Sequence, residues 1–217
     1  MKTRIKVCCI KSLQEAELAV RYGASALGFV SAMPSGPGPI PEEKIAEIIR
    51  QVPPGVSSFL LTGRQDAASI IDQQHRTRAN TIQLVDSVQI ETFVELRRAL
   101  PGIALVQVVH VTGPEAVETA VSIAPYINAV LLDSGNPNLP VKQLGGTGRV
   151  HDWSISKRIR ESVPVPVFLA GGLNAENVAE AIRRVRPFAV DVCSGLRTNG
   201  VLDEEKLARY VEQVASA

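Results

Sequence analysis

The chain has 217 residues, of which 45% are hydrophobic and 21% are charged. This balance is typical of a globular protein with enough apolar side chains for a core. Lys and Arg number 23, and Asp and Glu number 22, which excludes an electrostatic footprint for nucleic acid or an anionic membrane. The first residues lack the apolar segment of a signal peptide, and no apolar run approaches the ~18–20 residues that span a bilayer.

Three cysteines, Cys8, Cys9 and Cys193, have neither the number nor the spacing of a disulfide framework or a zinc site. We therefore expect free thiols, which are typical of a reducing compartment, and a cytoplasmic protein. Cys9 is expected to be a small buried hydrophobic side chain.

Short β-branched runs alternate with amphipathic segments along the whole chain, which is typical of a parallel sheet with crossover helices. The predicted strands are residues 5–9, 26–30, 57–61, 81–84, 104–109, 129–133, 167–170 and 189–192. The predicted helices are residues 12–22, 42–51, 66–76, 88–99, 114–123, 153–161, 175–185 and 203–215. Eight strand–helix units favour one (β/α)8 TIM barrel domain over residues 1–217 rather than an open doubly wound sheet.

Two connections that follow strands are longer than the usual ~2–6 residues. One spans residues 31–41 and is rich in proline and glycine, and the other spans residues 134–152 and contains Gly145-Gly146-Thr147-Gly148. Loops that follow the strands of a barrel lie at the face that carries function. The glycine run lacks the Lys-Ser/Thr that completes a nucleotide phosphate loop, and we expect its amides to contact ligand.

Small residues follow the seventh and eighth predicted strands: Gly171 and Gly172 after one, Ser194 and Gly195 after the other. Glycine lets the backbone approach an anion closely and turn its N–H groups toward it. Loops at these two places form the phosphate site of many barrels. We therefore predict a phosphorylated small-molecule ligand, although such glycines can also serve only to form tight turns.

The first strand carries a lysine and two adjacent cysteines. Because strand side chains alternate, Lys6 and Cys8 share one face, and Ile5, Val7 and Cys9 share the other. The apolar set is expected to face the helices, so Lys6 and Cys8 point into the barrel. The lysine favours the thiolate of Cys8, which suits a catalytic base, whereas the alternative is an inert buried thiol.

Asp133 ends an apolar strand, where a carboxylate is rare unless it caps a helix, pairs or reacts. The first and sixth strands are not neighbours, so Cys8 and Asp133 are predicted to face one another across the mouth. A base and an acid on opposite sides of a substrate suit proton removal from carbon with proton delivery to oxygen. The alternative is a carboxylate that caps a helix or orients the loop.

The three histidines, His75, His110 and His151, pair with no carboxylate or cysteine at the spacing of a metal site. We therefore predict no metal.

With these residues in view, the chain resembles the phosphoribosylanthranilate isomerase family over almost its whole length. The matching pieces are Lys6-Val7-Cys8, Gly28-Phe29-Val30, Gln83-Leu84, Leu131-Leu132-Asp133, Gly145-Gly146-Thr147-Gly148, Asp152-Trp153, Leu169-Ala170-Gly171-Gly172-Leu173 and residues 191–195. The family performs an Amadori rearrangement in tryptophan biosynthesis without a cofactor. The resemblance implies that Cys8 is the general base at the sugar C2, that Asp133 is the general acid at the ring oxygen, and that phosphate lies on the glycine-rich amides.

The sequence departs from the family on the side of the aromatic acid. The family's Cys-Gly is Cys8-Cys9 here, its Gln-Leu-His-Gly is Gln83-Leu84-Val85-Asp86, and the Glu after its Ser-Gly-Val is replaced in Leu196-Arg197. Its Ser-Pro-Arg, whose Arg holds the anthranilate carboxylate, is Ser35-Gly36-Pro37. Losing such a clamp forfeits ~1.5–3 kcal/mol per hydrogen bond. Arg197, in the loop after the eighth strand, is the expected substitute.

We therefore predict an aldose–ketose isomerase of this family that acts as a monomer or homodimer. The predicted substrate- or phosphate-binding residues are Lys6, Gly171, Gly172, Asp191, Ser194, Gly195 and Arg197. One alternative is a paralogue acting on a different phosphorylated small molecule. Another is a catalytically silent barrel that binds a phosphorylated metabolite, but such a protein has no need of an opposed acid and base.

Overall fold

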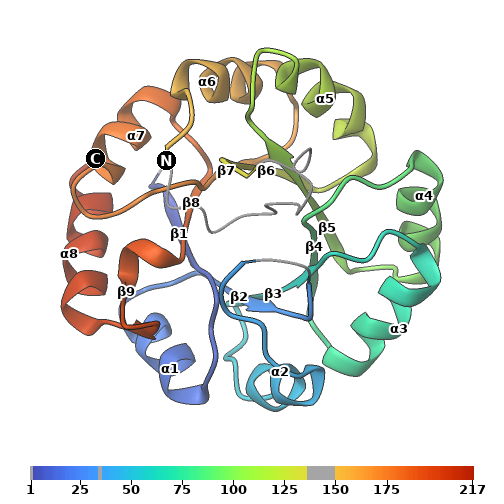
Figure 1. The fold of residues 1–217 in the computed structure, drawn as a ribbon, viewed down its shortest axis with the longest axis horizontal. Helices are drawn as coiled ribbons and strands as arrows, with labels where there is room; N and C mark the ends of the chain where they lie inside the picture. The colour runs from blue at the N-terminus through green and yellow to red at the C-terminus, as the bar shows by residue number, and fades with distance from the viewer. Residues whose placement is uncertain (1, 34–35, 136–149) are drawn as a thin grey trace.

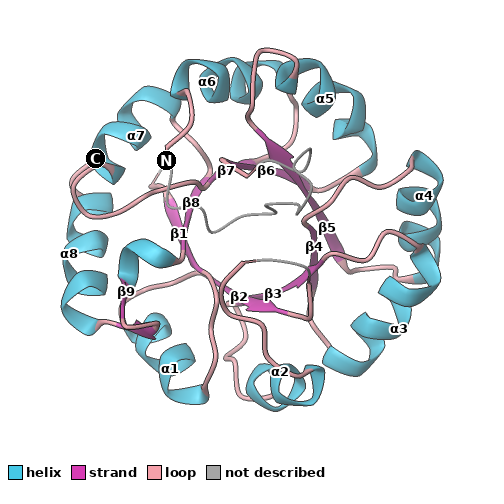
Figure 2. Cartoon of the chain, viewed as in Figure 1, coloured by secondary structure: helices cyan, strands magenta, loops and turns pink. Residues whose placement is uncertain are grey.

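The computed structural model describes residues 2–33, 36–135 and 150–217. Within them, eight parallel strands close into a barrel in the order β1 to β8, and helices surround it (Figures 1 and 2), which confirms the predicted (β/α)8 fold. The strands are β1 (Arg4–Val7), β2 (Ala26–Val30), β3 (Ser57–Thr62), β4 (Thr81–Leu84), β5 (Ala104–His110), β6 (Ala129–Asp133), β7 (Val167–Leu169) and β8 (Ala189–Val192). The helices are α1 (Leu13–Arg21), α2 (Glu42–Ile49), α3 (Ala67–Thr77), α4 (Ile90–Ala99), α5 (Ala116–Ile123), α6 (Trp153–Ser162), α7 (Val178–Val185) and α8 (Glu204–Ala215).

Short elements follow α5 and β8. A 3-10 turn, η1 (Ala124–Tyr126), extends α5, and a second, η2 (Ser194–Leu196), follows β8 and leads into the hairpin of β9 (Arg197–Thr198) and β10 (Val201–Leu202). None of the helices in the described residues is long and apolar enough to cross a bilayer.

The barrel closes where the first strand pairs with the last. In this seam Lys6 lies opposite Asp191 and Val7 opposite Val192. Residues from the two ends of the chain therefore become neighbours, and the loops that follow β1 and β8 leave the barrel side by side.

The core has two layers, because alternate side chains of each strand point to opposite faces. Ile5 and Val7 belong to the outer layer, between strands and helices. The inner layer fills the barrel and includes Phe59 and Phe168, whose ring centroids are 5.6 Å apart. Lys6 lies in this interior, 5.2 Å from the ring centroid of Phe59, so the predicted inward direction of its face is confirmed.

Several boundaries follow from capping and turn chemistry. Ser12, Asp66, Asp152 and Asp203 each accept a hydrogen bond from an N–H group in the first turn of the helix that follows, as good N-caps do. The predicted helix 175–185 begins only at Val178. Before it, Asn174 and Asn177 each accept a hydrogen bond from the other's backbone N–H, at 3.1 and 2.9 Å, and form a turn.

The predicted first strand, residues 5–9, is wrong at its C-terminal end. β1 ends at Val7, and Cys9 has a φ of 63°, in the left-handed region. Cys9 therefore does not follow the alternation of the strand: it packs with the inner layer rather than with Ile5 and Val7.

Candidate active site

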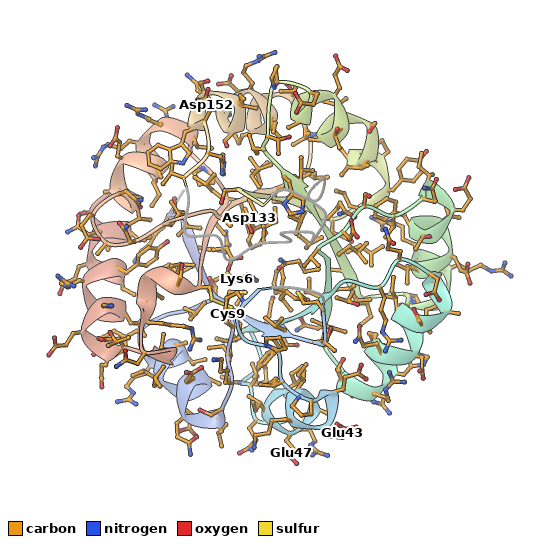
Figure 3. All side chains as sticks on the ribbon, in the orientation of Figure 1. Lys6, Cys9, Glu43, Glu47, Asp133 and Asp152 are labelled. Atoms are coloured by element: carbon orange, nitrogen blue, oxygen red, sulfur yellow. A yellow bond between two sulfur atoms is a disulfide. The ribbon has the colours of Figure 1, made fainter. Side chains whose placement is uncertain are left out.

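An ion pair lies inside the barrel at the seam. Nζ of Lys6 is 2.9 Å from Oδ2 of Asp191, and their side chains are 0% and 7% exposed. Burial alone lowers the pKa of Lys6, but Asp191 and Cys8 outweigh it and raise this pKa above its usual value. Lys6 is thus a fixed positive charge, and Figure 3 shows it near the centre of the ring of strands.

The thiol of Cys8 lies directly after β1, beside this charge. Cys8 is buried and free of any disulfide. A Cβ placed on Gly28 of β2 would come within 2.7 Å of its Sγ and 3.1 Å of Nζ of Lys6, so the sulfur and the ammonium group converge on the space that this glycine leaves. Burial raises the pKa of Cys8 to about 11, although Lys6 opposes the shift.

Asp133 is the last residue of β6, with its side chain partly buried. Its Oδ1 accepts a hydrogen bond from the N–H of Ser134 at 2.7 Å, and the residue pairs in register with His110 of β5. Burial raises the pKa of Asp133, and the charges of Lys6 and Asp191 also act on it. A carboxyl that keeps its proton more readily than usual is suited to general acid catalysis. Figure 3 places Asp133 toward the interior, whereas Glu43 and Glu47 lie at the outer rim.

The loops after β7 and β8 meet backbone to backbone. Gly171 and Gly172 have φ values of 85° and 64°, and a Cβ on Gly195 would overlap the carbonyl oxygen of Leu173. Within the described residues, the N–H groups of Gly172, Ser194 and Gly195 find no backbone acceptor. These amides are the donors that a phosphate needs.

His151 is a neighbour of this site that the sequence did not single out. A Cβ on Gly171 would lie 2.9 Å from its Nδ1 and 3.1 Å from Oγ of Ser134, so the ring reaches the loop after β7. Its Nε2 is 2.7 Å from Oγ of Ser156. Burial lowers the pKa of His151 to about 4, which makes the ring neutral at pH 7. In the sequence, only the place of His151 directly before Asp152, the cap of α6, could have indicated that it lies near the site.

The guanidinium of Arg197, a predicted substrate ligand, bonds to other residues of the protein through its two terminal nitrogens. Its Nη1 is 2.8 Å from Oε1 of Glu15, and both side chains are nearly buried, at 6% and 10% exposed. Its Nη2 donates to the carbonyl oxygens of Cys8, at 3.2 Å, and Cys9, at 2.5 Å. Arg197 therefore holds the loop after β1 against α1.

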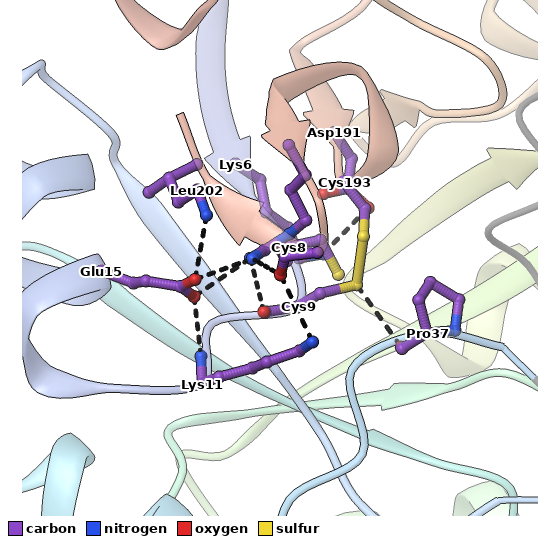
Figure 4. The surroundings of a disulfide bond; sticks show 11 residues. Lys6, Cys8, Cys9, Lys11, Glu15, Pro37, Asp191, Cys193 and Leu202 are labelled. Atoms are coloured by element: carbon purple, nitrogen blue, oxygen red, sulfur yellow. Dashed lines mark hydrogen bonds and ion pairs between the residues drawn. A yellow bond between two sulfur atoms is a disulfide. The ribbon is translucent and has the colours of Figure 1, made fainter. Parts of the chain in front are cut away.

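The prediction of three free thiols is wrong. Cys9 and Cys193 form a disulfide, with their Cα atoms 5.9 Å apart (Figure 4). Although 184 positions separate them in sequence, the pairing of β1 with β8 brings the two loops together. The spacing of the cysteines in the sequence does not predict this contact. Because the three thiols are not all free, they no longer support the expectation of a reducing compartment.

The run Gly145-Gly146-Thr147-Gly148 and Ser35 lie outside the described residues. In the part of the chain that is described, no group of three or more His, Cys, Asp or Glu side chains is arranged to hold a metal ion.

Comparison with known proteins identifies the family. The family model for N-(5'-phosphoribosyl)anthranilate isomerase matches residues 5–213. N-(5'-phosphoribosyl)anthranilate isomerase 2 of Methanosarcina mazei is 38% identical over 212 residues, covering 97% of this chain and 93% of the relative.

Comparison with solved structures leads to the same family. A phosphoribosylanthranilate isomerase in complex with reduced 1-(o-carboxyphenylamino)-1-deoxyribulose 5-phosphate has a TM-score of 0.82 at 28% identity, covering 99% of this chain and 100% of that one. The monomers generated from the dimeric enzyme of Thermotoga maritima give 0.81 at 27% identity, covering 99% and 100%. The chain therefore belongs to the N-(5'-phosphoribosyl)anthranilate isomerase family.

Proposed function

We propose that this chain isomerises N-(5'-phosphoribosyl)anthranilate, the aldose–ketose step of tryptophan biosynthesis, with Cys8 as general base and Asp133 as general acid. The observation that carries the assignment of roles is the contrast between these two groups. A buried thiol lies beside a fixed ammonium charge at one strand end, and a carboxyl with a raised pKa lies at the end of a strand that is not its neighbour. The family membership supplies the reaction.

The first step opens the sugar ring. Asp133 gives its proton to the ring oxygen as the bond between that oxygen and C1 breaks, while the nitrogen lone pair forms a C1–N double bond. The raised pKa of Asp133 supports this role, because the carboxyl must hold a proton at neutral pH to donate it.

The second step moves the double bond. The thiolate of Cys8 removes the proton from C2, and the electron pair of that C–H bond forms a C1–C2 double bond as the positive nitrogen becomes neutral. The resulting enol-amine becomes the ketone as C1 takes up a proton and the C2 hydroxyl loses one. Exchange with solvent then returns a proton to Asp133 and removes one from Cys8. The ammonium group of Lys6 supports the thiolate, and Asp191 holds Lys6 in place. Lys6 and Asp191 are thus proposed to position the base, below the ligand.

The phosphate is proposed to lie on the N–H groups of Gly172, Ser194 and Gly195. Their unpaired state among the described backbone groups supports this, as does the positive φ at Gly171 and Gly172, which only glycine adopts at low cost. The phosphate anchors the substrate at one end, so that C1, C2 and the ring oxygen lie between Cys8 and Asp133.

The family membership and the retained acid–base pair disfavour both a paralogue and a silent phosphate-binding barrel. We propose that residues 1–217 act as one domain. The dimeric origin of one solved relative supports a monomer or homodimer, and a biosynthetic role supports a cytoplasmic location.

The test is an isomerase assay on purified protein with phosphoribosylanthranilate, in which the fluorescence of the substrate is followed. Wild type is expected to turn over and Cys8→Ser to lose most of its activity. Binding of inorganic phosphate, measured in parallel, shows whether the variant is still folded at its site. A wild-type protein that binds phosphate but leaves the substrate unchanged would support the silent barrel instead.

A further inference from the structure

The disulfide joins the two loops that the proposed reaction depends on most. Cys9 directly follows Cys8, the proposed base, and Cys193 directly precedes Ser194 and Gly195, the proposed phosphate ligands. A single covalent bond therefore fixes the distance between the group that removes a proton and the loop that holds the phosphate.

The same bond also contacts the loop after β2. A Cβ on Gly38 would come within 2.7 Å of Cβ of Cys9, and Sγ of Cys9 lies 3.6 Å from the carbonyl oxygen of Pro37 (Figure 4). In the disulfide this sulfur carries no proton, whereas a Cys9 thiol can donate one to that oxygen. Reduction would thus exchange a covalent link to the loop after β8 for a weak hydrogen bond to the loop after β2.

The backbone around Cys9 is held under constraint. A φ of 63° is uncommon for a residue other than glycine, and Arg197 anchors the two carbonyl oxygens that flank the Cα atom of Cys9. Arg197 belongs to the loop after β8, and its bonds to Glu15 and to the loop after β1 persist without the disulfide. The freedom gained on reduction is therefore confined to residues 193–196, between the end of β8 and Arg197.

The two sulfurs differ in access. Cys9 is 4% exposed, whereas Cys193 is only partly buried, so Cys193 is the more accessible partner for an attacking thiolate. Cys8 is a weak competitor for these sulfurs at neutral pH, because burial raises its pKa and disfavours the thiolate.

We propose that Cys9 and Cys193 form a reversible disulfide site that controls the affinity of the loop after β8 for phosphate. This inference rests on the proposed phosphate site. The reductant is a dithiol. One of its thiolates attacks Sγ of Cys193, the S–S bond breaks, and Cys9 leaves as a thiolate that takes up a proton. The second thiolate of the reagent then displaces Cys193, so the dithiol becomes a cyclic disulfide and the protein gains two thiols. A disulfide reagent reverses both steps.

The experiment compares the wild-type protein after treatment with reduced and with oxidised dithiothreitol. Alkylation after denaturation, followed by mass measurement, gives one modified cysteine when the bond is closed and three when it is open. Inorganic phosphate binding is measured by calorimetry in both states. Because an unrestrained loop must be ordered when ligand binds, we expect the dissociation constant to rise about 10-fold on reduction. KM for phosphoribosylanthranilate should rise in parallel, with kcat changed by less than about 3-fold.

Cys193→Ser and Cys9→Ser are matched variants that keep Cys8. Both should bind phosphate like the reduced wild type and should not respond to either reagent. A disulfide that only stabilises the fold would move the melting temperature and leave the phosphate dissociation constant unchanged, which would overturn the proposal. Failure of the bond to form under oxidant would also overturn it. Absence of phosphate binding in both states would instead remove the phosphate site on which it rests.

Discussion

Polar side chains are buried in strands on both sides of the barrel, but those of β1 and β8 are charged and those of β3, β4 and β5 are not. Lys6 and Asp191 form an ion pair. On the other side the Gln107 amide donates to the carbonyl oxygens of Leu84 and Asp86 at 3.1 and 3.0 Å. Burying charge is costly unless the group is paired, and neutral amides satisfied by the backbone cost far less. The comparison indicates that one side of the barrel is built for chemistry and the other for support.

The largest expected effect is at the proposed acid–base pair, Cys8 directly after β1 and Asp133 at the end of β6. Cys8→Ser and Asp133→Asn should each lower kcat by about 10²–10⁴-fold, the usual contribution of a general base or acid. Phosphate binding should change little, because neither side chain belongs to the loops after β7 and β8. Steady-state kinetics with phosphate titration separates the two effects. Undiminished turnover in Cys8→Ser would exclude Cys8 as the base.

Breaking the buried pair of Arg197 and Glu15 should affect stability rather than specificity. Arg197→Ala leaves the Glu15 carboxylate buried without its partner, so we expect the free energy of unfolding to fall by about 3–5 kcal/mol. Denaturant unfolding measures this loss. The variant's KM for substrates with and without the anthranilate carboxylate should change by the same factor. A loss confined to the carboxylate-bearing substrate would restore Arg197 as a ligand.

On the supporting side, Gln107→Met should cost stability alone. Loss of the amide leaves the carbonyl oxygens of Leu84 and Asp86 short of a donor, and we expect about 1–3 kcal/mol of destabilisation. Turnover per folded molecule should stay within about 2-fold of wild type, since the residue contacts no proposed catalytic group. A large fall in kcat in this variant would break the distinction between the two sides.

The smallest expected effect concerns the loop after β2. Pro37→Arg places a guanidinium where the family has the residue that holds the anthranilate carboxylate. In an exposed loop one charge-assisted contact is worth about 1 kcal/mol, so KM should fall about 3- to 5-fold. The matched control is Pro37→Gln, which has a comparable length and no charge. An equal fall in KM for both variants would show that the charge is irrelevant.

The fold and the positions of the proposed catalytic pair followed from local patterns in the sequence. Alternation placed Lys6 inside the barrel, and strand ends placed Cys8 and Asp133 at one face. What the sequence did not predict depends on contacts between the chain's two ends. Cys9 and Cys193 meet only because β1 pairs with β8, and Arg197 turns toward Glu15 of α1 rather than to the mouth. Neither contact produces a periodic pattern in the sequence. The outward direction predicted for the Cys9 side chain assumed strand alternation, which the left-handed backbone at Cys9 interrupts.

The central claim is that catalysis needs Cys8 as a thiolate and Asp133 as a neutral acid in the same molecule. The pKa of Cys8 is raised to about 11, and burial also raises the pKa of Asp133. At any pH above the pKa of Asp133 and below that of Cys8, raising the pH gains thiolate and loses acid in equal proportion. The active fraction then stays constant.

The most direct measurement is therefore kcat/KM against pH, from 6 to 9, for wild type and Asp133→Asn. The wild-type profile should be level across the part of this range above the pKa of Asp133. The variant has no acid to lose, so its residual kcat/KM should climb about 10-fold per pH unit as the Cys8 thiolate forms. A variant profile as flat as that of wild type would contradict the assignment of the two roles.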